Sequence, residues 1–164
     1  MWLDGSCSCG AVRFGVEAYA PVPFTRCHCS ICRKTAGGGG YAINLGAYKD
    51  TMTVEGEADI GVFHAVIDGK ESEAERHFCL RCGSALWVFD PSWPDLVHPF
   101  ASAIDTALPE PPQVVHMMLG SRASWVRDEA RPGDASFDVY PDESLEDWHR
   151  RMGMLDARPT KRGG

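Results

Sequence analysis

The spacing of the cysteines constrains this chain more than any other feature of its sequence. The seven cysteines form three short clusters, a CxC at Cys7 and Cys9, a CxCxxC at Cys27, Cys29 and Cys32, and a CxxC at Cys79 and Cys82. An odd number of cysteines cannot all pair with one another, and the first residues lack the basic start and apolar stretch of a secretory signal. The clusters therefore favour metal binding or thiol chemistry in a reducing compartment. We expect a cytoplasmic protein.

The two outer clusters have the form of a structural metal site. In each of them a glycine, Gly10 or Gly83, follows the second cysteine. Glycine permits the positive φ of a tight turn whose backbone amides point at thiolate sulfur. A CxC and a CxxC far apart in sequence can converge into a closed tetrahedral site of four sulfurs, the usual geometry of structural zinc. The predicted ligands are Cys7, Cys9, Cys79 and Cys82. Buried reduced thiols and disulfides remain as alternatives.

The middle cluster offers three thiols and no obvious fourth ligand. If residues 27–29 are extended, Cys27 and Cys29 point to one side and His28 to the other. A helical turn that begins at Ser30 would bring Cys32 back to the same point. Three protein ligands with an open position are the pattern of a catalytic zinc, which lowers the pKa of whatever it binds. We therefore predict a second, catalytic zinc on these three cysteines.

The residues beside this cluster suggest an anionic thiol as substrate. Arg33 and Lys34 would favour thiolates and attract a carboxylated ligand, and together with His28 they are the predicted substrate-binding residues. The glycines 37–40 that follow form either a flexible connector or a ligand-facing loop. Two other interpretations remain, a metal-free cysteine cluster and a second structural site completed by a distant histidine. The candidates for that ligand are His64, His77, His98 and His116.

The remaining sequence predicts a mainly β domain. Its 164 residues, 44% of them hydrophobic and 24% charged, have the size and composition of one globular domain. Apolar residues alternate with period two, which indicates strands in an antiparallel meander or sandwich. The expected strands carry Val12 to Val16, Tyr41 to Leu45, Met52 with Val54, Ile60 to Val66, Ser84 to Phe89, Leu96 to Ile104 and Val114 to Leu119, with a turn at 67–70.

The C-terminal region predicts one short helix and a tail. Ser144 followed by Asp147 has the form of a capping box, and Leu145, Trp148 and Met152 fall on one helical face. We expect this helix to pack on the sheet. The prediction is one domain over residues 1–158 and a flexible tail over residues 159–164.

The charge and hydropathy of the sequence limit the classes of partner that we expect. With 16 Lys+Arg against 23 Asp+Glu the formal net charge is −7, which works against binding a phosphate backbone. No apolar run approaches the roughly 20 residues that cross a bilayer. We expect neither nucleic acid nor membrane as a partner, and the sequence makes no prediction of the oligomeric state.

The cysteine motifs resemble those of the glutathione-dependent formaldehyde-activating enzyme family, also called the GFA or CENP-V-like family. The resemblance is carried by Gly5-Ser6-Cys7-x-Cys9-Gly10, Cys27-His28-Cys29-x-x-Cys32-Arg33-Lys34 and Arg76-x-Phe78-Cys79-x-x-Cys82-Gly83. It implies an Mss4-like fold of antiparallel β-sheets, a tent or sandwich clipped by zinc. It also implies one structural zinc on the outer cysteines and one catalytic zinc on the middle three. In the activity that names the family, glutathione adds to formaldehyde to give S-hydroxymethylglutathione, a carbon–sulfur lyase reaction in reverse.

Three functions follow for this chain. The first is a zinc-dependent lyase that joins a small-molecule thiol to a small aldehyde at the open site. The second is a non-catalytic, zinc-stabilised protein-binding module, for which an exposed hydrophobic patch and a saturated second metal would be the marks. The third is a redox-active thiol protein, marked by reversible disulfides of the middle cluster.

Overall fold

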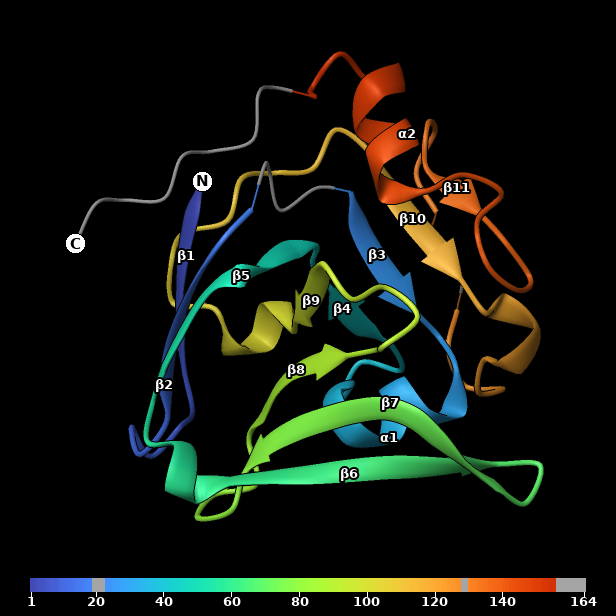
Figure 1. The fold of residues 1–164 in the computed structure, drawn as a ribbon. Helices are drawn as coiled ribbons and strands as arrows, with labels where there is room; N and C mark the ends of the chain where they lie inside the picture. The colour runs from blue at the N-terminus through green and yellow to red at the C-terminus, as the bar shows by residue number, and fades with distance from the viewer. Residues whose placement is uncertain (19–22, 128–129, 156–164) are drawn as a thin grey trace.

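Two β-sheets dominate the computed structural model, which describes residues 1–18, 23–127 and 130–155 (Figure 1). The larger sheet has seven strands in the order β1-β2-β5-β9-β8-β7-β6. They are β1 (Trp2–Ser6), β2 (Arg13–Glu17), β5 (Ala47–Glu55), β6 (Ile60–Ile67), β7 (Lys70–Cys79), β8 (Ala85–Phe89) and β9 (Leu96–Pro99). The smaller sheet, in the order β11-β10-β3-β4, contains β3 (Phe24–Cys27), β4 (Ala42–Asn44), β10 (Val114–Met117) and β11 (Ala135–Ser136).

The helical elements are short. The two α-helices are α1 (Ser30–Ala36) and α2 (Leu145–Arg151), and 3-10 turns occupy Glu57–Asp59, Ala101–Ala103 and Leu119–Ser121. In the described part of the chain, no helix has the length and apolar character needed to cross a membrane. The expected mainly β fold with a short C-terminal helix is confirmed. The predicted tail, residues 159–164, lies outside the described residues.

The larger sheet follows the predicted strand pattern closely. Strands β6 to β9 form the expected antiparallel meander, and the turn between β6 and β7 lies where the sequence places it. Asp68 and Gly69 have φ values of 51° and 79°, which is the left-handed pair that a two-residue hairpin turn requires. The alternation of Val12, Phe14 and Val16 is also explained, because all three side chains are buried in the main core.

The smaller sheet departs from the expected antiparallel arrangement. Strand β10 runs parallel to both β3 and β11, and only the β3–β4 pair is antiparallel. The pairing joins Cys27 at the end of β3 to Met117 at the end of β10. Alternating apolar residues specify which face of a strand is buried, but they carry no information about the direction of its neighbour.

Several strand boundaries also differ from the prediction. The strand expected from Leu96 to Ile104 ends at Pro99, because the chain turns there into a 3-10 helix closed by the bond from Ala103 N to Phe100 O. Strands β1, β3 and β7 were not predicted. In β7, charged residues occupy several positions, so that its long pairings with β6 and β8 decide its structure rather than its own apolar pattern.

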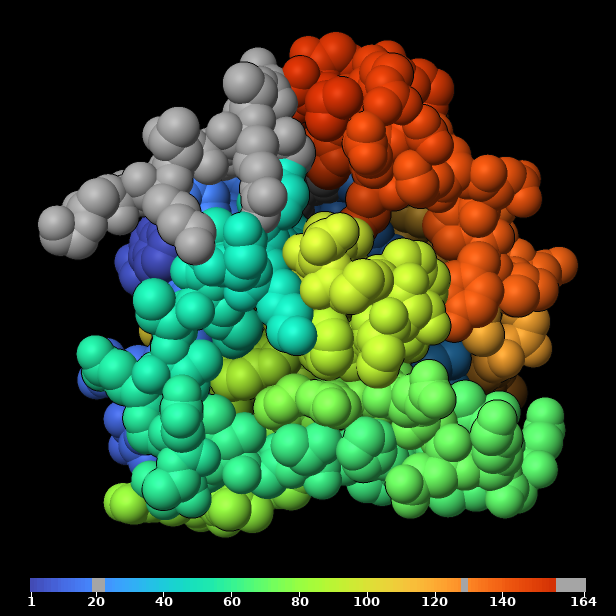
Figure 2. All heavy atoms as spheres, viewed as in Figure 1, coloured from blue at the N-terminus to red at the C-terminus, as the bar shows by residue number. Residues whose placement is uncertain are grey.

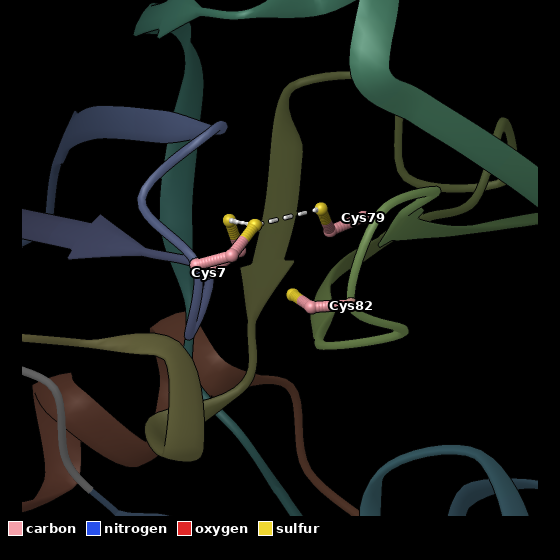
Figure 3. Close-up of side chains that lie close together, drawn as sticks. Cys7, Cys79 and Cys82 are labelled. Carbon is pink, nitrogen blue, oxygen red and sulfur yellow. Dashed lines mark hydrogen bonds between the residues drawn. The ribbon is translucent and has the colours of Figure 1, made fainter.

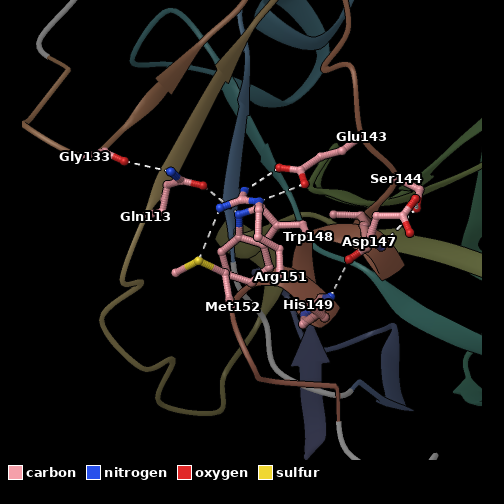
Figure 4. Close-up of polar contacts among 10 residues, drawn as sticks. Gln113, Gly133, Glu143, Ser144, Asp147, Trp148, His149, Arg151 and Met152 are labelled. Atoms are coloured by element: carbon pink, nitrogen blue, oxygen red, sulfur yellow. Dashed lines mark hydrogen bonds and ion pairs between the residues drawn. The ribbon is translucent and has the colours of Figure 1, made fainter.

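The C-terminal helix has the predicted cap and buried face (Figure 4). The hydroxyl of Ser144 accepts a hydrogen bond from Asp147 N at 3.1 Å and donates one to the Asp147 carboxylate at 2.8 Å. Trp148 is buried, and its indole N–H donates to Gln113 Oε1 at 2.6 Å, just before β10 begins. Glu143 and Arg151 form an ion pair that joins the two ends of the helix. The helix is thereby fixed to the smaller sheet.

Two apolar clusters lie inside the fold. The main core belongs to the larger sheet and includes Phe14, whose ring meets Trp87 edge to face at 5.1 Å. The second cluster joins the end of β3 and α1 to β7 and β8, and it contains Cys27, Cys32, Ala74, Val88 and Phe100. This second cluster holds the middle cysteines against the larger sheet.

Candidate metal centres

The outer cysteine clusters converge at one end of the larger sheet (Figure 3). The sulfur atoms of Cys7, Cys9, Cys79 and Cys82 all lie within 4.8 Å of one another. The Cys7–Cys9 sulfurs are 3.5 Å apart and the Cys9–Cys79 sulfurs 3.8 Å apart. Four sulfurs placed at about 2.3 Å from a tetrahedral zinc would be about 3.8 Å from one another. The donor atoms therefore fit a closed four-sulfur zinc site.

Two tight turns bring these sulfurs together. Gly10 and Gly83 both have φ of 73°, as expected for glycines that close a metal-binding turn. The Gly10 amide donates to Cys7 O at 3.0 Å, and the Gly83 amide donates to Cys79 O at 2.8 Å. The amide of Val12 points at the Cys7 sulfur at 3.2 Å, which stabilises negative charge there.

A serine hydroxyl links the two arms of this site. Ser84 Oγ accepts a hydrogen bond from Ser8 N at 3.0 Å and lies 3.2 Å from the sulfur of Cys82. Hydrogen bonds from the Ser84 side chain and backbone lower the pKa of Cys82 to about 6. For Cys9, a backbone hydrogen bond from Ala11 favours the thiolate, but the adjacent thiols and desolvation outweigh it and raise its pKa to about 11. The four thiolates can coexist only beside a cation.

The middle cluster also converges, and it does so within one short segment. The sulfur atoms of Cys27, Cys29 and Cys32 lie within 4.8 Å of one another. Cys27 ends β3, Cys29 is extended and caps α1, and Cys32 lies in the first turn of that helix. The amide of Cys32 donates to the Cys29 sulfur at 3.3 Å. The predicted change from extended chain to helix at Ser30 is therefore confirmed, and we call these three residues the cysteine trio.

The thiols of the cysteine trio share their protons unequally. Hydrogen bonds from Cys29 and then Cys32 raise the pKa of Cys27, and burial adds to this effect. Hydrogen bonds from Cys27 and Cys32 lower the pKa of Cys29 instead. One thiolate is thus stabilised by two neighbouring thiols. A cation bound by all three sulfurs must displace the remaining protons, so its affinity will rise with pH.

The described part of the chain brings no fourth protein ligand to the cysteine trio. Within the described residues, no histidine nitrogen or carboxylate oxygen joins its three sulfurs at the distance that unites them. The predicted alternatives have other contacts, since His64 Nδ1 lies 3.0 Å from Ser72 O and His98 Nδ1 lies 3.1 Å from Leu45 O. His77 stacks on Trp87, and His116 Nε2 lies 3.7 Å from Asp134. The geometry therefore favours three ligands and an open position over a completed structural site.

The comparison with known proteins agrees with this arrangement. The sequence model of the family described as "Glutathione-dependent formaldehyde-activating enzyme" matches residues 2–120, which contain all three cysteine clusters. The chain belongs to this family. It is 60% identical over 157 residues to a protein of Halomonas elongata named "Putative glutathione-dependent formaldehyde-activating enzyme", a match that covers 96% of this chain and 100% of that relative.

A solved structure supports the fold of this family member. The crystal structure of a Rhodobacter sphaeroides protein, a structural genomics target, superposes with a TM-score of 0.50 at 26% sequence identity. The match covers 65% of this chain and 91% of the Rhodobacter protein.

The predicted substrate-binding residues differ in exposure in this family member. His28 is only 1% exposed, and its ring packs against those of Tyr41 at 5.2 Å and His116 at 5.9 Å. Lys34 is exposed on α1. Arg33 is half-buried on the same helix, and its Nε atom is buried with no hydrogen-bond partner. Their contacts with a substrate remain predictions.

Two polar side chains beside the cysteine trio were missed by the sequence analysis. Asn44 Nδ2 points at the Cys32 sulfur at 4.0 Å. Burial and then the charges of the three cysteines raise the pKa of Tyr140. The bond from Met118 N to Val139 O, 2.8 Å long, holds the residue before Tyr140 against the end of β10, whose Met117 pairs with Cys27. No sequence motif marks either residue, because each reaches the site only through the tertiary fold.

The segments that surround the cysteine trio border a recess on one face of the molecule. In Figure 2 the β6–β7 hairpin, the chain near residue 90 and the chain near residue 140 surround blue atoms of the β3–α1 region. The Tyr140 side chain remains 60% exposed. The recess therefore opens to solvent beside the segments that carry the cysteine trio.

The glycines after α1 pack closely at both ends of their segment. A Cβ on Gly37 would lie 2.3 Å from Tyr41 O, and one on Gly40 would lie 2.2 Å from Val126 Cγ2, so both residues are required for close packing. Gly38 and Gly39 are exposed, and a Cβ on either would meet nothing within 4 Å. The close contacts at both ends show that this segment is more than a flexible connector.

Proposed function

We propose that this chain is a zinc-dependent carbon–sulfur lyase that adds glutathione or a similar thiol to formaldehyde or another small aldehyde. The observation that carries the proposal is the convergence of Cys27, Cys29 and Cys32 with no fourth ligand among the described residues. A closed site would have no place for a substrate. The family name supplies glutathione and formaldehyde as the first candidates.

In the proposed reaction the thiol sulfur forms a bond to the carbonyl carbon. The C=O double bond becomes a C–O single bond, and the proton lost by the thiol ends on that oxygen, so the product is an S-hydroxymethyl thioether. No oxidant or reductant is needed. A zinc ion at the open site would supply the chemistry of holding the substrate sulfur as a thiolate at neutral pH.

The protein's own residues have separate tasks in this proposal. Cys7, Cys9, Cys79 and Cys82 hold the structural zinc, and the cysteine trio holds the catalytic one. Arg33 and Lys34 attract the substrate's carboxylates, and His28 supports the substrate side of the site. Tyr140 keeps its proton because its pKa is raised. Its phenol can therefore donate a hydrogen bond to the oxygen on which negative charge develops.

The proposal is tested by metal content and by exchange kinetics. Protein purified without chelator should contain about two zinc ions per chain if both sites are filled. Because thiols add to formaldehyde spontaneously, the rate should be measured as exchange of ¹³C label between formaldehyde and its glutathione adduct at equilibrium. We expect wild-type protein to accelerate this exchange and Cys29→Ser to leave it at the uncatalysed rate. One zinc per chain together with uncatalysed exchange would overturn the proposal.

A protein-binding role has one observation in its favour. The edge strand β6 exposes apolar side chains, which are Val62, Phe63, Val66 and Ile67. Exposed apolar edge strands can pair with another chain. The second mark of a binding module, a saturated second metal site, is not seen in the described residues. The redox alternative stays a separate prediction, in which the free cysteines of the trio form disulfides reversibly.

A further inference from the structure

We propose that Arg76 on β7 is the residue of this site that binds a carboxylate of the thiol substrate. The inference rests on the proposed function, because it takes the cysteine trio as the place where the substrate sulfur binds. It adds a cationic residue on β7 to Arg33 and Lys34, the two predicted substrate-binding cations on α1.

The register of the sheet aims Arg76 at the cysteine trio. Residues two apart on a strand share a face, and Ala74, two residues before Arg76, packs in the same cluster as Cys27 and Cys32. Directly opposite residues of paired strands also share a face. The partner of Arg76 on β8 is Val88, which belongs to that cluster too. Two independent neighbours therefore place the Arg76 side chain on the side of the cysteine trio.

Two nitrogens of the half-buried Arg76 side chain lack an acceptor. Its Nε and Nη1 atoms are buried and find no hydrogen-bond partner within the described residues. In residues 1–18, 23–127 and 130–155, no carboxylate forms an ion pair with it. Leaving such donors unpaired costs free energy, and a carboxylate accepts strong, charge-assisted hydrogen bonds from guanidinium N–H groups. A substrate carboxylate would supply an acceptor to this guanidinium.

The acidic residues of the same hairpin do not neutralise Arg76. Glu75 lies between Ala74 and Arg76 on β7, so it points to the opposite face of the sheet. Glu75 pairs there with His77 at 3.6 Å, and Glu73 is exposed. The chain's net charge of −7 therefore does not describe the surroundings of Arg76.

A competing role for Arg76 is to balance the charge of the sulfurs. A hydrogen bond from Cys27 and, less strongly, the charge of Arg76 favour the Cys32 thiolate, whereas the Cys29 hydrogen bond and burial oppose it and raise the Cys32 pKa overall. A residue that only balanced this charge would affect every ligand equally. A residue that binds a carboxylate affects only ligands that carry one, and this difference can be measured.

The test uses a ligand that has carboxylates and no thiol. S-methylglutathione and its diethyl ester are titrated calorimetrically into zinc-loaded wild-type, Arg76→Gln and Arg76→Lys proteins. We expect Arg76→Gln to bind the diacid about 10- to 100-fold more weakly, as for a lost charge-assisted pair, and Arg76→Lys to fall between them. The diester should bind weakly to all three. Arg150→Gln is the control, since Arg150 lies exposed on α2 and pairs with Glu146.

Three results would overturn this inference. They are equal diacid affinity of Arg76→Gln and wild type within twofold, equal loss for the diester, and no binding of the diacid by wild-type protein. If Arg76→Gln does not fold, two measurements still test the inference. They are the preference of wild-type protein for the diacid over the diester and the affinity of Arg76→Lys for the diacid. Binding requires neither aldehyde nor turnover. Carboxylate-dependent binding without accelerated exchange would reject the proposed lyase function and retain the anion site.

Discussion

The two cysteine sites are built from the same donor atom but differ in how the chain delivers it. The closed site joins two turns of the larger sheet. Two of its neighbouring cysteines, Cys9 and Cys79, are 70 residues apart in the sequence. The cysteine trio occupies only residues 27–32, at the junction of β3 and α1. A metal in the closed site therefore closes a long loop and stabilises the fold, whereas a metal in the trio stabilises little beyond its own segment.

This difference also separates the chemistry of the two sites. Four sulfurs complete the preferred coordination of zinc at the closed site, while the described residues supply only three at the trio. The trio also has polar neighbours from distant elements, Asn44, Arg76 and Tyr140. A site that holds the fold together gains from completeness, and one that performs chemistry needs a vacancy with functional groups around it.

The largest effect should follow from a change in the closed site. Cys79→Ser replaces a fully buried ligand. Structural zinc contributes about 10–16 kcal/mol of apparent binding energy in small zinc domains, which is comparable to the roughly 5–15 kcal/mol stability of a typical domain. We expect the variant to be unfolded or insoluble, as measured by soluble yield and near-ultraviolet circular dichroism. A folded variant with normal thermal stability would contradict the structural assignment.

A change in the cysteine trio should separate activity from folding. Cys29→Ser removes the half-buried thiol with the lowered pKa, and we expect loss of one metal per chain and of catalysed ¹³C exchange. The melting temperature should change far less than in Cys79→Ser, because the β3 pairings and the surrounding apolar cluster remain. Equal destabilisation by the two substitutions would show that the sites do not divide their tasks as proposed.

The hydroxyl at the closed site should control its acid sensitivity. The pKa of Cys82 in the folded protein is about 6, below the ordinary thiol value of 9.0. The Cys82 thiolate therefore stabilises the folded state fully above pH 9.0, and this contribution is lost as the pH falls through about 6. Ser84→Ala removes the largest cause of the lowered pKa. We expect zinc release to begin at higher pH and metal affinity to fall about 10-fold.

A chromophoric chelator measures this release across a pH series. Ser92→Ala is the matched control, because Ser92 is exposed and lies outside both metal clusters. If Ser84→Ala and wild-type protein release zinc with the same pH midpoint, the Ser84 hydroxyl does not control the acid sensitivity of the closed site.

The smallest effects concern the glycine segment that follows the open site. Gly37→Ala forces a Cβ against Tyr41 O and should lower the free energy of unfolding by about 1–3 kcal/mol. Gly38→Ala meets open space and should change it by no more than about 0.5 kcal/mol. Urea unfolding of the two variants measures the difference. Equal stabilities would show that the segment is a plain connector.

Local chemistry made much of this structure predictable from the sequence. The left-handed glycines after Cys9 and Cys82 and the Asp68-Gly69 turn are fixed by backbone conformations that few residues tolerate. The Ser144 cap and the helical return of Cys32 to Cys29 depend on residues three apart, which one helical turn brings together. In each case the interacting groups are neighbours along the chain.

The sequence alone determined that cysteines would gather in two closed turns and one open cluster, because their spacing and flanking residues act locally. The tertiary structure decided the parallel pairing of β10 with β3, and it decided that Asn44 and the Arg76 segment of β7 lie beside the trio. The physical reason is that a strand residue's environment depends on the register and direction of its partners. Those properties follow from the packing of the whole fold, and no short segment contains them.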